Sequence, residues 1–229
     1  MRIAMSAGRV IGVLLSVQIV SGILVNFVLT APLFGQPGFL ESAAEHSNQI
    51  AVSVLLGIAT GAISIGIAIA AYPYFRSHSQ SLSLWFVALA VANFSGAAVE
   101  NMNVLSMVSL SEMYAKASPA SHDLFQGLRV VVASSRNWAH YVNLIIAGGM
   151  LLVFYTALYR CALIPRPLAA FGLAAVILQL IAVTMPIFGH SVVFLMLAPL
   201  GVTQIAVALW LTAKGFPTQL QSRSELSDA

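Results

Sequence analysis

The chain alternates between long apolar stretches and short polar connections, and this pattern predicts its architecture. A helix that crosses the hydrocarbon core of a bilayer needs about 20 apolar residues. The stretches that are long enough run over Val10–Ala31, Ser47–Tyr72, Leu82–Val108, Asn137–Tyr159, Pro167–Phe188 and Ser191–Ala213. They are about twice as long as the strands of membrane barrels, and in lipid their backbone polar groups must be satisfied within the segment. The sequence therefore predicts an all-α, six-transmembrane-helix bundle.

The connection between the third and fourth stretches is too long for a simple turn. Pro119 and Ser121 mark a helix start, after which apolar residues recur at helical spacing. These residues are Leu124, Phe125, Leu128, Val131 and Val132. The pattern predicts an additional amphipathic helix in this outer loop. It either lies on the outer leaflet or extends the fourth span, and a packed lid without a membrane or ligand role is the alternative.

The composition supports a membrane protein. Of 229 residues, 59% are apolar and 7% are charged, whereas soluble domains carry about 25% charged residues. Mean hydropathy is +0.93. These values exclude an ordinary cytosolic enzyme, a disordered chain and, with the single cysteine Cys161, a disulfide scaffold. We expect a single six-helix membrane domain over residues 1–216 and a mobile cytoplasmic tail over residues 217–229.

The basic residues predict how the chain is oriented. One side of the predicted bundle carries seven of them, namely Arg2, Arg9, Arg76, Arg160, Arg166, Lys214 and Arg223. The other side carries three, namely Lys116, Arg129 and Arg136. The excess predicts that both termini are cytoplasmic, in a bacterial inner membrane. Because these residues are scattered singly at helix ends, the charge of +3 does not indicate a nucleic-acid partner.

Polar residues gather at the outer ends of the predicted helices. Glu100 lies inside the third span, and Asn93 shares its helix face at a spacing of seven residues. Arg136, His140 and Asn143 share one face at the outer end of the fourth span. An ionisable residue within a span costs about 2.5 to 3.5 kcal/mol on insertion scales, so each such residue is a functional hypothesis.

These side chains are predicted to form a polar chamber near the outer leaflet that binds or senses a small or lipidic ligand. The candidate ligand-binding residues are Glu45, His46, Asn93, Glu100, Asn101, Arg136, His140, Asn143 and His190. Small residues spaced four apart at Ser53, Gly57 and Gly61 predict that another helix approaches the second span closely.

Two other functions remain open from the same residues. A metal-dependent, hydrolase-like membrane enzyme would hold a transition metal with His46, His140 and His190 and use Glu100 as its base. Histidines could also hold haem axially. A hydrogen-bonded network that only closes the bundle is the structural alternative. The sequence alone leaves open whether the protein is an enzyme, and it does not fix the oligomeric state.

The last third of the chain resembles a known family. Residues 160–166 read Arg-Cys-Ala-Leu-Ile-Pro-Arg, and residues 210–216 read Trp-Leu-Thr-Ala-Lys-Gly-Phe. These motifs resemble the bacterial integral-membrane family catalogued as domain of unknown function 4386. The resemblance implies six membrane helices and no established activity. It also implies that Gln204 stands where many members have a glutamate.

Overall fold

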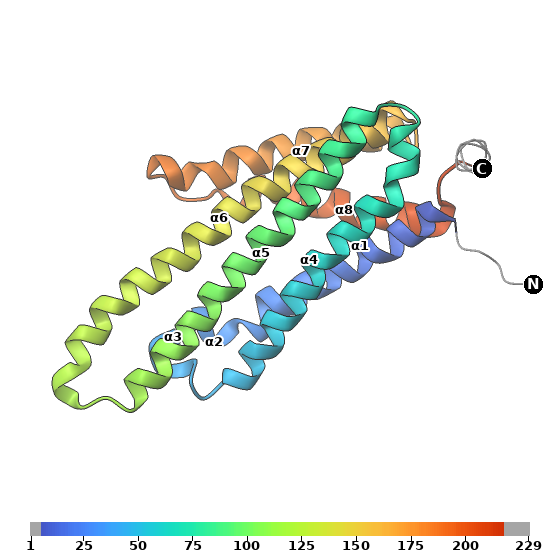
Figure 1. Ribbon diagram of the computed structural model, residues 1–229. Coiled ribbons are helices and arrows are strands. Elements are labelled where there is room, and N and C mark those ends of the chain that lie inside the picture. Colours follow the sequence, from blue (N-terminus) through green and yellow to red (C-terminus); the bar gives the residue numbers. More distant parts are fainter. Residues whose placement is uncertain (1–5, 218–229) are drawn as a thin grey trace, which may run out of the picture. The chain divides into compact units, whose positions relative to one another are not determined.

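The computed structural model describes residues 6–217, and this part of the chain forms helices joined by turns and short loops (Figure 1). The helices are α1 (Ala7–Leu24), α2 (Ala31–Phe34), α3 (Phe39–Ser42), α4 (Ser47–Arg76), α5 (Gln80–Ala115), α6 (His122–Arg160), α7 (Arg166–Thr184) and α8 (Ala198–Lys214). A π-helical turn, Val25–Leu29, continues α1, and 3-10 turns lie at Pro119–Ser121, Met185–Phe188 and Phe194–Met196.

Six helical segments of the described chain are long and apolar enough to cross a membrane. They are Ala7–Leu29, Ser47–Arg76, Gln80–Ala115, Pro119–Arg160, Arg166–Phe188 and Phe194–Lys214. The predicted all-α architecture with six spans is confirmed. The predicted tail beyond Pro217 lies outside the described residues, and the single domain over residues 1–216 stays a prediction.

The additional helix predicted between the third and fourth spans is not a separate element. α6 runs without a break from His122 to Arg160, so the amphipathic segment forms its first turns. No proline lies between Pro119 and Pro165 to stop the helix. A separate outer helix is therefore wrong, and an extension of the fourth span is correct. The 36 residues of α5 and the 39 of α6 exceed the length that a bilayer requires.

The chain divides into two compact units. The first unit comprises the described residues of Met1–Ile19, Ile63–Asn93 and Leu144–Ala229. The second comprises Val20–Ala62 and Phe94–Asn143. Each unit has its own buried apolar cluster.

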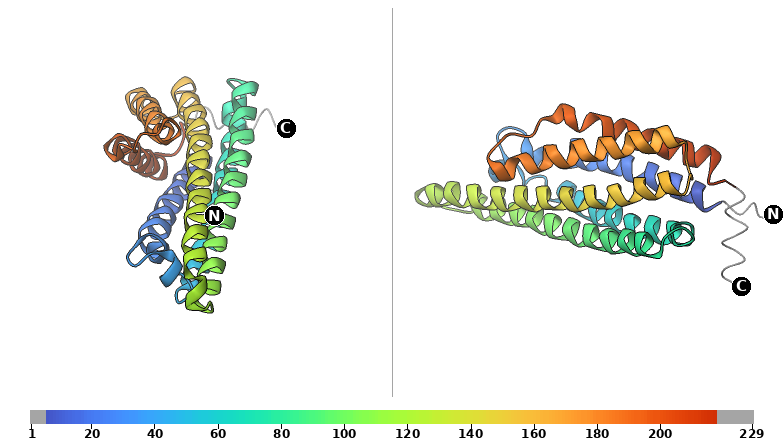
Figure 2. Two further views of the ribbon diagram at one scale, coloured as in Figure 1. Left: turned by 90° about the vertical axis from the view of Figure 1, so that its left-hand side faces the viewer. Right: turned by 90° about the horizontal axis from the view of Figure 1, so that it is seen from above.

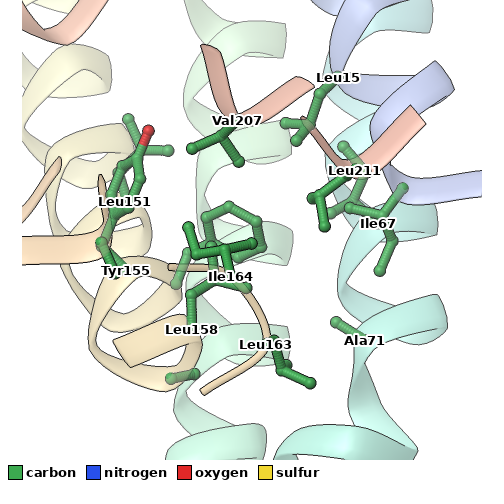
Figure 3. Close-up of a cluster of buried hydrophobic side chains, with 14 of the residues drawn as sticks. Leu15, Ile67, Ala71, Leu151, Tyr155, Leu158, Leu163, Ile164, Val207 and Leu211 are labelled. Atoms are coloured by element: carbon green, nitrogen blue, oxygen red, sulfur yellow. The ribbon is translucent and has the colours of Figure 1, made fainter. Parts of the chain in front are cut away.

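The first unit is built on apolar side chains from six helices and the α6–α7 connection. Figure 3 shows Leu15 of α1, Ile67 of α4, Tyr155 of α6 and Leu211 of α8 in one cluster, with Ile164 of the α6–α7 connection among them. Figure 2 shows α7 and α8 side by side, and they pack against each other. Burial of these side chains stabilises the unit through packing.

The second unit packs the α5–α6 hairpin against the short helices α2 and α3 and the first half of α4. Its buried cluster includes Leu33, Phe39, Ile50, Met107 and Phe125. Phe125 belongs to the predicted amphipathic stripe and is 8% exposed, because it packs into this cluster. Leu124 and Val131 of the same stripe are each 65% exposed. The stripe is thus only partly covered within the unit.

Gly172 allows α7 to approach α6 closely. A methyl group at this position would overlap the ring of Tyr155, which is 1% exposed and lies in the core. A methyl group at Gly201 of α8 would meet no atom within 4 Å. The two glycines therefore form a matched pair for testing the α6–α7 contact.

We expect Gly172→Ala to lower the stability of the detergent-solubilised protein by about 1 to 3 kcal/mol, because the buried tyrosine ring must move. Gly201→Ala should be neutral or slightly stabilising, because alanine favours helix more than glycine. Thermal unfolding of both variants in one detergent checks the prediction. Equal melting temperatures for the two variants would contradict the close contact.

Candidate functional site

The carboxylate of Glu100 in α5 accepts hydrogen bonds from three side chains of α6. Its Oε1 atom accepts from Arg136 Nη2 at 2.9 Å and lies 2.8 Å from His140 Nδ1. Its Oε2 atom accepts from Asn143 Nδ2 at 3.4 Å. We call Glu100, Arg136, His140 and Asn143 the Glu100 cluster. All four residues belong to the second unit.

Helix periodicity brings the α6 members of the cluster together. Arg136, His140 and Asn143 stand at spacings of four and three residues, which puts them on one face of a helix. That face meets α5 at Glu100, as the contacts with its carboxylate show. The sequence located this face on α6, and the structure adds its partner on α5.

The cluster is largely buried, and the positive charge of Arg136 compensates the negative charge of Glu100. The side chains of Arg136 and Glu100 are 10% and 16% exposed, whereas that of His140 is 29% exposed. A carboxylate only accepts hydrogen bonds, so His140 Nδ1 donates to ionised Glu100. In the neutral tautomer of His140, donation through Nδ1 leaves Nε2 as the acceptor nitrogen. That nitrogen belongs to a side chain that is more exposed than those of Glu100 and Arg136.

Arg136 has a second contact that the sequence did not predict. Its guanidinium lies 4.6 Å from the ring centroid of Phe34 in α2, in a cation–π arrangement. Arg136 Nε is buried and has no hydrogen-bond partner among the described residues. The signal that could have pointed to Phe34 is weak, because an aromatic residue in a short connecting helix has many possible roles.

Three glycines allow close contacts between helices of the second unit, and one of them lies beside the cluster. A methyl group at Gly96 of α5 would lie 2.6 Å from Asn143 Oδ1, which is buried and has no hydrogen-bond partner in the described chain. A methyl group at Gly57 of α4 would lie 2.9 Å from the Asn101 side-chain amide. At Gly61 it would lie 3.1 Å from the ring of Phe94. The close approach predicted from the small residues of the second span is confirmed at α5.

The other candidate residues of the second unit make separate contacts. Asn101 Nδ2 donates to Ala97 O at 2.8 Å, within its own helix. His46 is exposed, and its Nδ1 lies 2.9 Å from Ser42 O. Glu45 is also exposed. None of these contacts reaches Glu100, and the larger chamber stays a prediction.

Two candidate residues belong to the first unit. Asn93 Nδ2 donates to Ser64 Oγ at 3.4 Å, and Gln18 Nε2 donates to the same oxygen at 2.8 Å. His190 is exposed in the turn that follows Phe188. Asn93 therefore helps to join α1, α4 and α5 through amide and hydroxyl groups.

The metal hypothesis requires ligands that share one ion. Of the proposed ligands, His46 and His140 belong to the second unit and His190 to the first. Among residues 6–217, no three His, Cys, Asp or Glu side chains are grouped so that they could hold a metal ion. His140 instead uses one ring nitrogen to bind Glu100.

We expect Glu100→Gln to lower stability by about 3 to 5 kcal/mol, because it leaves the Arg136 charge buried without its partner. The double variant with Glu100→Gln and Arg136→Met should recover most of this loss, because both charges are removed. Thermal unfolding in detergent checks the pair. A double variant that is no more stable than Glu100→Gln alone would show that the charges do not depend on each other.

Comparisons with known proteins agree with the fold and add no activity. The family model described as "Domain of unknown function (DUF4386)" matches residues 10–215. A search of curated proteins found no match, and a search of solved structures found none either. The matched region contains the Glu100 cluster and nearly all of every span. The chain belongs to the family described as domain of unknown function DUF4386.

Proposed function

We propose that this membrane protein binds the polar head of an amphiphile at the Glu100 cluster. The observation that carries the proposal is the sharing of Glu100 Oε1 by Arg136 and His140. This arrangement neutralises the carboxylate and fixes one nitrogen of His140. The other nitrogen belongs to a side chain that is more exposed than those of Glu100 and Arg136. A ligand can meet it without breaking the ion pair.

The position of the cluster along its helices suits an amphiphile. Glu100 lies 20 residues after Gln80 at the start of α5, and His140 lies 20 residues before Arg160 at the end of α6. At 1.5 Å per residue both distances are about 30 Å, which is the thickness of the hydrocarbon core. If the polar ends of both helices mark one membrane boundary, the cluster lies at the other. A bound amphiphile would keep its chain in lipid and its head at the cluster.

The chemistry of the cluster favours a head group that donates a hydrogen bond. In the neutral tautomer of His140 that donates to Glu100 through Nδ1, Nε2 is an acceptor. A hydroxyl group can satisfy this nitrogen, and it brings no net charge to a site whose charges already compensate. We therefore propose an uncharged, hydroxylated head such as a glycerol. No contact in the described chain supports the metal-enzyme or haem alternatives, and we do not propose them.

His140→Asn tests the proposal, because the asparagine amide can still donate to Glu100 while the acceptor at Nε2 is lost. We expect about three- to tenfold weaker retention of 1-oleoylglycerol, the effect of one lost hydrogen bond, as measured by native mass spectrometry in detergent. His46→Asn is the matched control and should retain the lipid as the natural chain does. Methyl oleate, which has no hydroxyl group, should bind all forms weakly.

Three outcomes would contradict this function. The first is equal retention of 1-oleoylglycerol by His140→Asn and the natural chain. The second is equal retention of methyl oleate and 1-oleoylglycerol by the natural chain. The third is a loss with His140→Asn that is accompanied by loss of the folded protein, which would indicate a structural network only.

We also propose that both termini face the cytoplasm of a bacterial inner membrane. The sequence pattern assigns seven of the ten basic residues to the side of the termini, and such an excess is typical of the cytoplasmic side. The connection between α6 and α7 then lies on the same side. It contains Cys161, the only cysteine of the chain.

Cys161 reports this orientation directly. We expect a membrane-impermeant maleimide to label it in inverted vesicles and not in intact cells. Burial raises the pKa of the Cys161 thiol, so less of the reactive thiolate is present near neutral pH. The labelling rate should therefore be low at pH 7 and rise about tenfold per pH unit below that raised pKa. Labelling in intact cells would reverse the proposed orientation.

A further inference from the structure

A pocket in the first unit is lined by two segments that the proposed function does not use. It has a volume of about 410 Å³ and lies where α6 connects to α7 and where α8 ends. Residues 162–165 line one side of it, and Trp210 with residues 214–217 lines the other. Both segments belong to the motifs that stand out in the sequence, and the fold brings them to one place.

The pocket combines apolar side chains with a cation. Leu163, Ile164 and Phe216 are only 2% to 4% exposed, so their side chains belong to the packed core beneath it. Trp210 is 39% exposed, and Lys214 is exposed at the last turn of α8. An indole beside an ammonium group at a helix end is typical of the zone where lipid head groups meet the hydrocarbon core.

Between positions 6 and 217, the unit that contains the pocket has basic residues and no acidic ones. The described part of the first unit contains basic residues only, namely Arg9, Arg76, Arg160, Arg166 and Lys214. The acidic residues between positions 6 and 217 all belong to the second unit, namely Glu41, Glu45, Glu100, Glu112 and Asp123. Among the described residues of the first unit, the pocket therefore has cations near it and no carboxylate.

A second basic side chain lies beside the end of α8. A methyl group at Gly215, which lines the pocket, would lie 3.3 Å from Cγ of Arg9. Arg160 and Arg166 flank the connection that forms the opposite side. Clustered cations at a helix end attract anionic lipids.

We propose that this pocket binds the head group of an anionic phospholipid. Lys214 pairs with the phosphate, while the exposed part of Trp210 contacts the glycerol and the first carbons of the acyl chains. The indole favours a lipid over free phosphate, because an inorganic anion gains nothing from contact with an apolar ring. The site is independent of the Glu100 cluster.

The experiment uses the full chain in detergent and phosphatidylglycerol as the probe, with bound lipid counted by native mass spectrometry. We expect Lys214→Gln to bind phosphatidylglycerol about fivefold more weakly, the effect of one cation near a lipid phosphate. Lys214→Arg should bind it like the natural chain. Lys116→Gln removes the other lysine of the chain, which lies in the second unit, and should change nothing.

A second readout locates the lipid. With Trp85 and Trp138 changed to phenylalanine, Trp210 is the only tryptophan left. Phosphatidylglycerol with brominated acyl chains should then quench its fluorescence, and Lys214→Gln should shift this quenching to about fivefold higher lipid concentration. Phosphatidylcholine with the same brominated chains should quench the two forms equally.

Four results would overturn the proposal. They are equal loss of phosphatidylglycerol in Lys214→Gln and Lys116→Gln, equally tight binding of phosphatidylcholine and phosphatidylglycerol, and displacement of the lipid by millimolar inorganic phosphate. The fourth is tighter binding of phosphatidylglycerol when Glu225→Gln and Asp228→Asn remove the acidic groups that follow Pro217, because the chain itself would then compete for the pocket.

Discussion

The second unit depends on the ion pair between Glu100 and Arg136. Both residues lie in helices that are apolar enough to cross a membrane, where an isolated charge is costly. Pairing at 2.9 Å lowers that cost, and the bond from His140 to the same oxygen lowers it further. Because the partners come from α5 and α6, they specify how these helices face each other. Removal of either charge leaves the other charge buried without its partner.

Small residues make this pairing possible. Gly96 leaves room for the Asn143 amide beside Glu100, and Gly57 does the same for the Asn101 amide. Between membrane helices, van der Waals contact and polar bonds replace the hydrophobic effect as the force of association. Glycine therefore acts here by bringing backbones close enough for polar side chains to reach their partners. The same principle joins α6 to α7 at Gly172 and Tyr155 in the first unit.

Charge is distributed unequally between the two units. All the acidic residues of the described chain belong to the second unit, where one of them compensates a buried arginine. The part of the first unit that the structure describes contains basic residues and no acidic ones. This distribution leads to two different ligand chemistries in our proposals. A site with balanced charges suits an uncharged head group, and a site with unbalanced cations suits a phosphate.

The sequence by itself determined the six spans and the shared face of Arg136, His140 and Asn143, because length, hydropathy and the helical period are local properties. Only the tertiary structure decided that this face meets Glu100 and that Phe34 covers Arg136. It also separated Asn93 and His190 from the unit that holds the cluster, and it merged the predicted outer helix into α6. These features depend on the rotation of each helix about its axis and on contacts between distant residues, which no local pattern encodes.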